Sequence, residues 1–345
     1  LSAILNPGTN VRLPAEEITL ADLLKAAGYA TGMVGKWHLG DRSPSLPNDM
    51  GFDSYFGALY SNDMEPFAFY RNTDIVEQAP ADQTLMTEKY TRAATDFSEQ
   101  PSNDNFFLYF AHNFPHDPLF VREARAGSSN AGLYGDVLEE IDDSVGRIVA
   151  ALQRTGTLDN TLIIITSDNG PWFLGDAGNL RGRKGNTFEG GMRVPFIAHW
   201  PQQLQSLGTV DSMAMGTDLF PTVLEILGLP APADRKLDGR SILHVVTKGA
   251  PTPHHFLVYI DGQSLFAVRS QRFKYRGPAG VFYYTDSMPM GGAVPQKEWL
   301  FDLAGDTREA YDTSLKHPQQ LEHLRKAFET KQADMATNPR GWISP

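Results

Sequence analysis

The segment TLIIITSDNG, residues 161–170, decides the fold class. Its first six residues are apolar or β-branched without alternation, which is typical of a strand buried on both faces of a sheet. The polar residues Ser167, Asp168 and Asn169 follow at the end of this strand, and Gly170 lets the chain turn there. In an open α/β sheet ligands bind at the carboxyl ends of the strands, so this segment predicts both a sheet and a site.

Other apolar runs and helices extend this pattern along the chain. Residues 29–37, 106–111 and 194–199 are predicted strands, and a short capped helix begins at Thr19. The clearest amphipathic helix covers 134–152, where apolar residues recur at helical spacing. Strands that alternate with helices predict an α/β fold with a large mixed, mostly parallel sheet sandwiched by helices.

The character of the sequence changes after the proline-rich stretch at 229–232. A β-hairpin with a third strand is predicted over 256–275, and a last helix near 318–330. We therefore expect a main α/β domain over residues 1–250 and a smaller C-terminal α+β subdomain, with an antiparallel sheet, over residues 251–345.

Composition excludes several classes of protein. The 345 residues include 30 Lys and Arg against 41 Asp and Glu, a net charge of −11, which is unfavourable for non-specific nucleic-acid binding. No apolar run is long enough to span a bilayer. The chain has no cysteine, so these residues hold no disulfide, thiolate metal site or cysteine nucleophile. It also lacks an Asn-x-Ser/Thr acceptor, which favours a bacterial source.

Two pairs of polar residues at strand ends are candidates for a site. Asp168 and Asn169 supply oxygen donors suited to Ca²⁺ or Mg²⁺, although an isolated Asp-Asn-Gly is more typical of a loop turn. Lys36 and His38 are two residues apart, so in extended backbone they point to one side. An ammonium beside an imidazole suits an anionic substrate, whereas the alternative is an ordinary surface loop.

Further candidates lie in two loops. His116 stands between prolines in FPHDP, a rigid loop that can aim a side chain, although most histidines in loops are simply solvated. His112 is a weaker candidate at the same strand end. Arg181 and Lys184 lie among glycines in LRGRKGNTFEGG, where basic groups cradle an oxyanion or simply face solvent. The irregular stretch 44–83 is expected to form long surface loops, and its aromatic residues to be loop packing or, alternatively, a surface that stacks on a ring.

These motifs occur together in a fixed order, and in that order the sequence resembles the sulfatase family, in its arylsulfatase A-like branch of the alkaline-phosphatase-like superfamily. The combination of GKWHLG, SDNG and KG-x-x-x-EGG-x-R-x-P is specific to it. The resemblance covers nearly the whole chain and is carried by GYATGMVGKWHLG (28–40), NDMGFDSYFG (48–57), FFLYFAHNFPHDP (106–118), TLIIITSDNGP (161–171), LRGRKGNTFEGGMRVPFIAHWP (180–201) and TDLFPTVLEILG (217–228).

The resemblance implies a sulfuric ester hydrolase. Lys36 and His38 match the pair that binds the sulfate and assists the leaving group, and His116 matches a second histidine at the other side of the sulfate. Lys184 matches the lysine that bridges the sulfate and the nucleophile. In the family a hydrated formylglycine attacks sulfur, a histidine protonates the departing alcohol, and the sulfated intermediate releases inorganic sulfate.

The resemblance also implies a metal site that this sequence only partly supplies. Asp168 and Asn169 match two ligands of a divalent cation, commonly Ca²⁺. The family's two adjacent metal-binding aspartates and its Cys-x-Pro-Ser-Arg segment, the source of formylglycine, have no counterpart here. We therefore expect a sulfatase without its N-terminal part, including the first strand and the nucleophile helix, which binds Ca²⁺ weakly and is inactive or severely impaired by itself.

Two alternatives stay open. A phosphomonoesterase or phosphonate hydrolase of the same superfamily shares the logic of the metal site. A sulfatase-like pseudoenzyme without a nucleophile would instead bind sulfated ligands. The expected partner is a small-molecule or glycan sulfate ester, and the family implies a periplasmic or extracellular location.

Overall fold

The computed structural model describes residues 5–100, 105–204, 207–262, 264–278, 281–282, 293–294 and 297–337. The chain forms two compact units, Ala3–Leu158 and Asp159–Arg340. The boundary expected at residue 250 falls inside the second unit, and the assignment of a separate domain after it stays a prediction. Among the described residues, no helix has both the length and the apolar character needed to cross a membrane.

The first unit is built on a five-stranded sheet with the order β4-β3-β2-β1-β5. Strand β1 runs parallel to both of its neighbours, β2 and β5, whereas β3 is antiparallel to its neighbours β2 and β4. The predicted mixed, mostly parallel α/β sheet is confirmed by this arrangement. The strands are β1 (Ala30–Lys36), β2 (Ser54–Ala58), β3 (Phe69–Arg71), β4 (Asp74–Glu77) and β5 (Phe106–Ala111).

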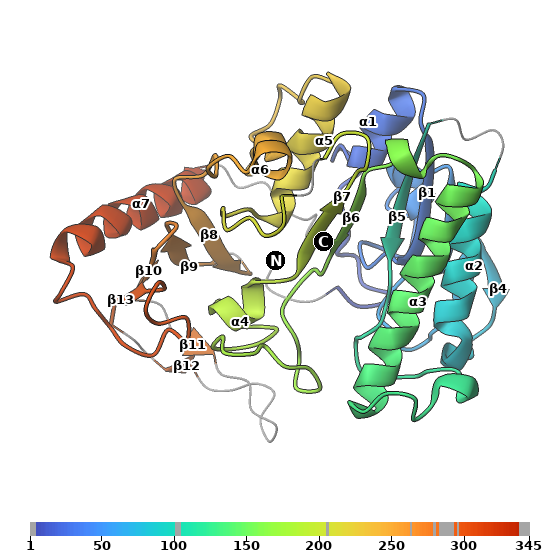
Figure 1. Cartoon of the computed structure of the whole chain (residues 1–345), viewed down its shortest axis with the longest axis horizontal. Coiled ribbons are helices and arrows are strands. Elements are labelled where there is room, and N and C mark those ends of the chain that lie inside the picture. The colour runs from blue at the N-terminus through green and yellow to red at the C-terminus, as the bar shows by residue number, and fades with distance from the viewer. Residues whose placement is uncertain are drawn as a thin grey trace. The chain divides into compact units, whose positions relative to one another are not determined.

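Helices cover this sheet, and two of them run side by side. α2 contacts β1 and β5 and also packs against α3 (Figure 1). α3 confirms the helix predicted over 134–152, and α1 starts at a capping box in which Thr19 and Asp22 bond each other's backbone. The helices are α1 (Leu20–Ala26), α2 (Met86–Ser98) and α3 (Gly132–Arg154), with short 3₁₀ turns η1 (Pro47–Met50), η2 (Gln83–Leu85), η3 (Glu123–Arg125) and η4 (Leu158–Asn160).

The stretch 44–83, expected to be surface loops, contributes three strands and part of the core. Phe67 and Phe69 are buried, and the ring of Phe69 lies 6.0 Å from Phe56 and 5.9 Å from Tyr90 between centroids. The interpretation of these aromatic residues as packing is confirmed. The strands were missed because they are only three to five residues long and turns separate them.

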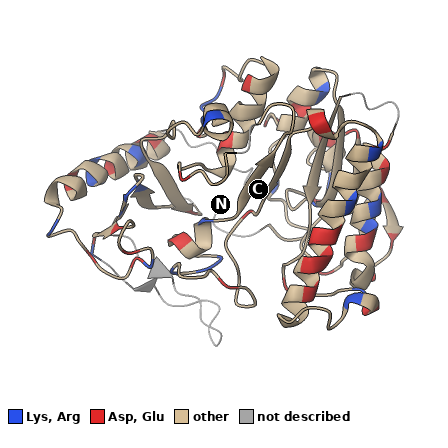
Figure 2. Cartoon of the chain, viewed as in Figure 1, with Lys and Arg blue, Asp and Glu red and all other residues tan. Residues whose placement is uncertain are grey.

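Charged residues of both signs lie along α2 and α3 (Figure 2), and some of them form ion pairs. Arg122 contacts Glu88 at 3.1 Å and also pairs with Glu140, and Arg147 reaches Glu88 at 2.6 Å. An isolated view of the helix would place Glu140 in solvent, but its side chain is buried against Arg122. A buried carboxylate needs such a partner to offset the loss of water.

The second unit contains two described sheets and a two-stranded pair. β6 and β7 are antiparallel to each other, so the strand predicted at 194–199 exists but does not pair in a parallel sheet. The other elements in this part of the second unit are short helices and turns. The bounds are β6 (Ile163–Thr166), α4 (Glu189–Met192), β7 (Phe196–His199), η5 (Gly216–Asp218), α5 (Leu219–Leu227) and α6 (Leu243–Lys248).

The C-terminal part of this unit is an antiparallel sheet of order β13-β10-β9-β8, as the sequence predicts. The helix α7 packs along β9 and β10, and its Phe328 lies 5.4 Å from the ring of Tyr275 (Figure 1). The bounds are β8 (Leu257–Asp261), β9 (Ser264–Arg269), β10 (Phe273–Arg276), β13 (Trp299–Asp302) and α7 (Pro318–Thr337), with the small pair β11 (Val281–Phe282) and β12 (Ala293–Val294).

The Phe69→Ala substitution should destabilise the first unit by about 3–5 kcal/mol, because it removes a fully buried ring and leaves a cavity between β3 and α2. Urea unfolding measures the loss. Val76→Ala on the neighbouring strand β4 is the matched control, since Val76 is 51% exposed, and it should change stability by less than about 0.5 kcal/mol. Equal losses in the two variants would contradict this description of the core.

Candidate functional site

The loops that follow β1, β2 and β5 leave the sheet at one edge, because the three strands are parallel. They form a strand-end cluster, and backbone and side-chain contacts join them. Asn113 Nδ2 donates to Tyr60 O at 3.3 Å, and Asn62 Nδ2 donates to Pro118 O at 2.8 Å. The cluster therefore contains three of the predicted site residues: Lys36, His38 and His116.

His38 is held in an uncommon conformation beside Tyr60. Its φ is +61°, which is rare for a residue with a side chain, and its backbone N–H donates to Leu59 O at 2.8 Å. The Nε2 atom lies 2.9 Å from Leu5 O, and the imidazole meets the Tyr60 ring edge to face, with centroids 5.3 Å apart. These contacts fix the imidazole, and backbone strain of this kind is concentrated at functional sites.

His116 is held by its own loop and faces a carboxylate. Its backbone N–H donates to Asn113 O at 3.1 Å, and Nδ1 lies 2.7 Å from Asp117 O. The same nitrogen is 3.8 Å from Asp63 Oδ1, so the imidazole faces a carboxylate as well as a carbonyl oxygen. A histidine placed in this way can hold a proton and release it to a leaving group.

Several buried polar atoms of the strand-end cluster have no hydrogen-bond partner among the described residues. They are Tyr60 Oη, Ser61 Oγ, Asn62 Oδ1 and His112 Nε2. Buried polar atoms are nearly always satisfied, so four orphans in adjoining loops indicate a place where water or a ligand binds. Sequence reasoning did not assign Ser61, Asn62 or Asp63 to the site; the signal would have been this polar run shortly after Ser54–Ala58, but that strand was itself not predicted.

His112 differs from the other histidines because burial lowers its pKa to about 3. Its Nδ1 accepts from the backbone N–H of Phe114 at 2.9 Å, which places the proton of the neutral ring on Nε2. Part of the residue is exposed, but this Nε2 is buried. His112 is therefore a neutral hydrogen-bond donor near neutral pH rather than an acid.

In the second unit, the chain after β6 is joined to the loop that carries Lys184. Gly170 N–H donates to Gly191 O, and Lys184 N–H donates to Pro171 O, both at 2.9 Å. A Cβ at Gly170 would clash with the carbonyl oxygen of Gly190, so only glycine permits this approach. The structure thus places Asp168 and Asn169 on one of two joined loops and Lys184 on the other.

Arg181 takes part in internal contacts of the second unit. Its Nη1 donates to Glu309 O at 2.7 Å, and its guanidinium lies 4.0 Å from the centroid of Phe188 and 5.8 Å from that of Trp299. These contacts hold the start of the Lys184 loop. A role of Arg181 in substrate binding stays a prediction.

A buried ionic network anchors the other end of this loop. Lys274 Nζ lies 3.0 Å from Glu189 Oε1 and 2.9 Å from Glu309 Oε1, and Arg269 also pairs with Glu189. Tyr259 Oη donates to Glu189 at 2.7 Å. Burial alone would raise the pKa of Glu189, but Lys274 and Arg269 reverse this and lower it. Burial lowers the pKa of Lys274 and raises that of Glu309.

The donor set for a metal ion is incomplete in the described residues. They contain no group of three or more His, Asp or Glu side chains placed to hold a metal. Asp168 and Asn169 offer one carboxylate and one amide, whereas Ca²⁺ takes six to eight oxygen ligands. These two residues by themselves therefore do not make a complete calcium site.

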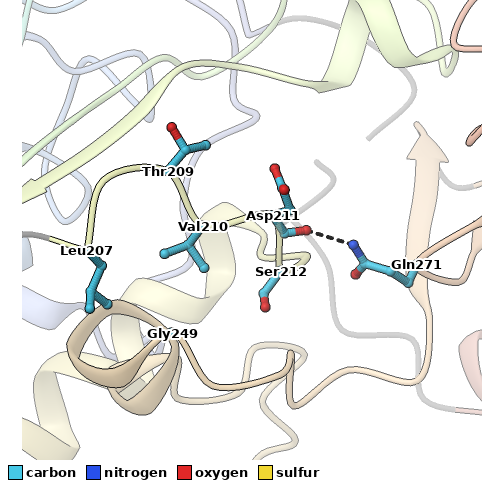
Figure 3. Close-up of a pocket in the computed structure, with 7 residues that line it drawn as sticks. All are labelled: Leu207, Thr209, Val210, Asp211, Ser212, Gly249 and Gln271. Atoms are coloured by element: carbon cyan, nitrogen blue, oxygen red, sulfur yellow. Dashed lines mark hydrogen bonds between the residues drawn. The ribbon is translucent and has the colours of Figure 1, made fainter.

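A pocket elsewhere in the second unit is unrelated to the predicted site residues. Figure 3 shows it, with the amide of Gln271 donating to Asp211 O at 2.7 Å. None of the predicted site residues lines it. Its walls are Leu207, Thr209, Val210, Asp211, Ser212, Gly249 and Gln271.

Comparison with known proteins identifies a family. A family model described as Sulfatase matches residues 2–229, and one described as N-sulphoglucosamine sulphohydrolase, C-terminal, matches residues 183–285. N-acetylgalactosamine-6-sulfatase of Mus musculus is 36% identical over 285 residues, which is 76% of this chain and 55% of the relative. Arylsulfatase A of Bos taurus is 31% identical over 380 residues, 94% of this chain and 74% of the relative. The chain thus spans about half the length of the first of these relatives.

Solved structures share the fold. A sulfatase from Pseudoalteromonas sp. aligns with a TM-score of 0.88 and 23% identity over 98% of this chain and 77% of its own. A structure from work on glycosaminoglycan metabolism by Bacteroides thetaiotaomicron aligns with a TM-score of 0.84 and 24% identity over 96% and 85%. The family model and the relatives at 31–36% identity confirm the resemblance seen in the sequence motifs, and the solved structures show the shared fold.

Lys274→Met should destabilise the second unit by about 3–5 kcal/mol, because it leaves Glu189 and Glu309 buried without their shared cation. Urea unfolding measures the loss, and adding Glu309→Gln to the same chain should recover part of it. Lys236→Met is the control, since the exposed Lys236–Asp334 pair contributes less than about 1 kcal/mol. Similar losses for the two lysines would disprove the anchoring role.

The low pKa of His112 predicts a pH dependence of stability. The unfolded chain takes up a proton on His112 near its ordinary pKa of 6.5, whereas the folded chain does so only near 3. The contribution of His112 is therefore complete above pH 6.5 and is lost as the pH falls, by up to about 1.4 kcal/mol per pH unit. His112→Asn should flatten the slope of unfolding free energy between pH 6.5 and 4, whereas the exposed His199→Asn should not. An unchanged slope in His112→Asn would refute the assignment.

Proposed function

This chain belongs to the sulfatase family, and from that premise we propose that it binds a sulfate monoester and is the larger part of a machinery that hydrolyses it to an alcohol and inorganic sulfate. The observation that carries the proposal is the strand-end cluster. It brings Lys36 and two fixed imidazoles to the end of parallel strands, together with buried polar atoms that have no hydrogen-bond partner among the described residues.

Each charged residue has a distinct role in this proposal. Lys36 offsets the negative charge of the sulfate, which grows on the bridging oxygen as the ester S–O bond breaks, and Lys184 is assigned the same role only by its match to the family motif. A histidine, His38 or His116, gives its proton to that oxygen so that the alcohol leaves neutral. His116 is suited to carry the proton because Asp63 lies 3.8 Å from its Nδ1.

The nucleophile is the part of this chemistry that the chain does not supply. The family uses a formylglycine made from cysteine, and none of the 345 residues is a cysteine. We therefore propose that these residues alone bind the ester but turn it over very slowly or not at all. A formylglycine for this site has to come from outside them.

A divalent cation, Ca²⁺ or Mg²⁺, belongs to the same proposal. Asp168 and Asn169 would be two of its oxygen ligands, and the ion would supply positive charge to the sulfate oxygens. With one carboxylate, these residues alone should bind Ca²⁺ weakly, since affinity follows the number and charge of the ligands.

The substrate class we propose is a sulfated sugar. The support comes from relatives: two of those at 36–37% identity are named N-acetylgalactosamine-6-sulfatase, and a solved structure 25% identical to this chain is a complex with a neocarrahexaose. A phosphate or phosphonate ester is the second candidate, because a phosphonate monoester hydrolase of Agrobacterium radiobacter shares the fold with a TM-score of 0.62. Binding without catalysis is the third, and the absence of cysteine favours it.

The chain should bind N-acetylgalactosamine 6-sulfate without releasing sulfate. Calorimetry measures the affinity and ion chromatography measures free sulfate. Lys36→Ala should weaken binding about tenfold, because it removes one charged partner of the anion, whereas Lys248→Ala, at the exposed end of α6, should not.

Three outcomes distinguish the candidates. Sulfate release by this chain would show that a nucleophile exists within these residues. Equal affinity for N-acetylgalactosamine 6-phosphate would favour a phosphate ester as the ligand. Binding that is unaffected by Lys36→Ala would remove the strand-end cluster from the site.

A further inference from the structure

The loop that follows Asp168 and Asn169 presents aromatic surface. The rings of Trp172 and Phe173 are 4.7 Å apart between centroids, with their planes at 82°. Both residues are partly exposed, and the next residue, Leu174, is 51% exposed. A turn closes the segment, because Gly175 N–H donates to Trp172 O at 3.2 Å. Adjacent apolar side chains that face water on a loop are a common mark of a ligand surface.

This aromatic pair lies next to the loop of Lys184. The Lys184 N–H donates at 2.9 Å to the carbonyl oxygen of Pro171, the residue immediately before Trp172. Gly170 N–H makes a second link between the two loops, to Gly191 O at 2.9 Å. The aromatic pair therefore begins one residue after Pro171, which is bonded directly to the backbone of Lys184.

Arg183 connects the aromatic pair with the basic loop. Its guanidinium carbon lies 4.1 Å from the centroid of the Phe173 ring. Within the described part of the chain, that guanidinium makes no hydrogen bond and no ion pair, while its backbone N–H is held by Asn186 Oδ1 at 3.2 Å. Stacking fixes the plane of a guanidinium and leaves the N–H groups at its edge free to bind an anion bidentately.

The charge around this surface suits an anion. Between residues 168 and 187 the only acidic side chains are Asp168 and Asp176. Asp168 belongs to the proposed cation site, and Asp176 Oδ1 accepts the backbone N–H of Gly178 at 2.7 Å. No carboxylate of this loop is paired with Arg183.

We propose that Trp172, Phe173 and Arg183 form a second sugar subsite, which binds an anionic sugar adjacent to the one whose sulfate lies at Lys184. The C–H face of the second pyranose packs on the aromatic pair, and its sulfate or carboxylate group binds the Arg183 guanidinium. This inference rests on the proposed function, because it takes Lys184 to bind the first sulfate. It assigns the chain an acidic oligosaccharide rather than a small aryl sulfate.

Calorimetry on the full chain tests the subsite through a ratio of two dissociation constants. The probes are N-acetylgalactosamine 6-sulfate and the disaccharide in which glucuronate is joined to it. The disaccharide should bind roughly tenfold more tightly. Trp172→Ala and Arg183→Ala should each bring the ratio close to one, and Trp172→Phe should keep part of the gain.

Two controls separate the second subsite from the first. Lys184→Ala should weaken both ligands and leave their ratio unchanged. Arg92→Ala, which removes an exposed arginine of α2 paired with Asp96, should change neither affinity nor ratio. The uronate methyl ester and a disaccharide sulfated on both sugars show whether Arg183 recognises carboxylate, sulfate or both.

The results distinguish a failure of the second subsite from a failure of the proposed function. If the wild-type chain binds the two ligands equally, or if the ratio survives in Trp172→Ala and Arg183→Ala, the subsite is refuted while the proposed function stands. If the chain binds neither ligand, the proposed function fails, and the subsite fails with it. Far-UV circular dichroism of each variant confirms that the comparison is between folded chains.

Discussion

The strand ends of the first unit depend on a close approach of backbone at Gly35. This residue has a φ of +116° and lies opposite Gly57 on one side and Ala111 on the other. A Cβ on Gly35 would clash with the Ala111 carbonyl oxygen, and a Cβ on Gly57 would clash with that of Gly35. Three parallel strands can therefore come together here only because glycine occupies both positions. The next residue is Lys36, so the constraint that closes the sheet also fixes where the strand-end cluster begins.

In the second unit, buried ion pairs as well as close backbone contacts hold the loop that carries Lys184. Glu189 and Lys274 are 85 residues apart in the chain, and both are buried. Removing such groups from water costs several kcal/mol each, which is tolerable only when opposite charges and hydrogen bonds replace the lost hydration. Arg276 adds to this anchoring, because it donates to Thr187 O at 2.9 Å and stacks on Phe188. The antiparallel sheet thus holds the loop that carries Lys184.

Local sequence patterns made much of the fold predictable. Features that depend on contacts between residues far apart in the sequence were not predictable. Helix α3 and the C-terminal hairpin were predictable because their periodicity extends over many residues. The strands between residues 54 and 77 were not, since they are short and pair mainly with each other. The burial of Glu140 was not predictable either, because its partner Arg122 lies 18 residues away. The same limit applies to the site: the order of the motifs pointed to His38 and His116, whereas no motif marked Ser61. It is recognised only because its hydroxyl has no hydrogen-bond partner within the described part of the chain.

Arg181 and Arg183 show why contacts, and not motifs, separate folding from binding. They stand two residues apart in one basic, glycine-rich segment, and by sequence alone they are equivalent. Yet Arg181 donates to Glu309 O within the unit, whereas the Arg183 guanidinium stacks on Phe173 without a hydrogen-bond partner among the described residues. A donor that is already satisfied contributes little to a ligand, while a fixed and unsatisfied donor loses little entropy when a ligand arrives. Because folding itself places these charges, the ability to bind an anion does not depend on the presence of a nucleophile, and the two properties can be gained or lost separately.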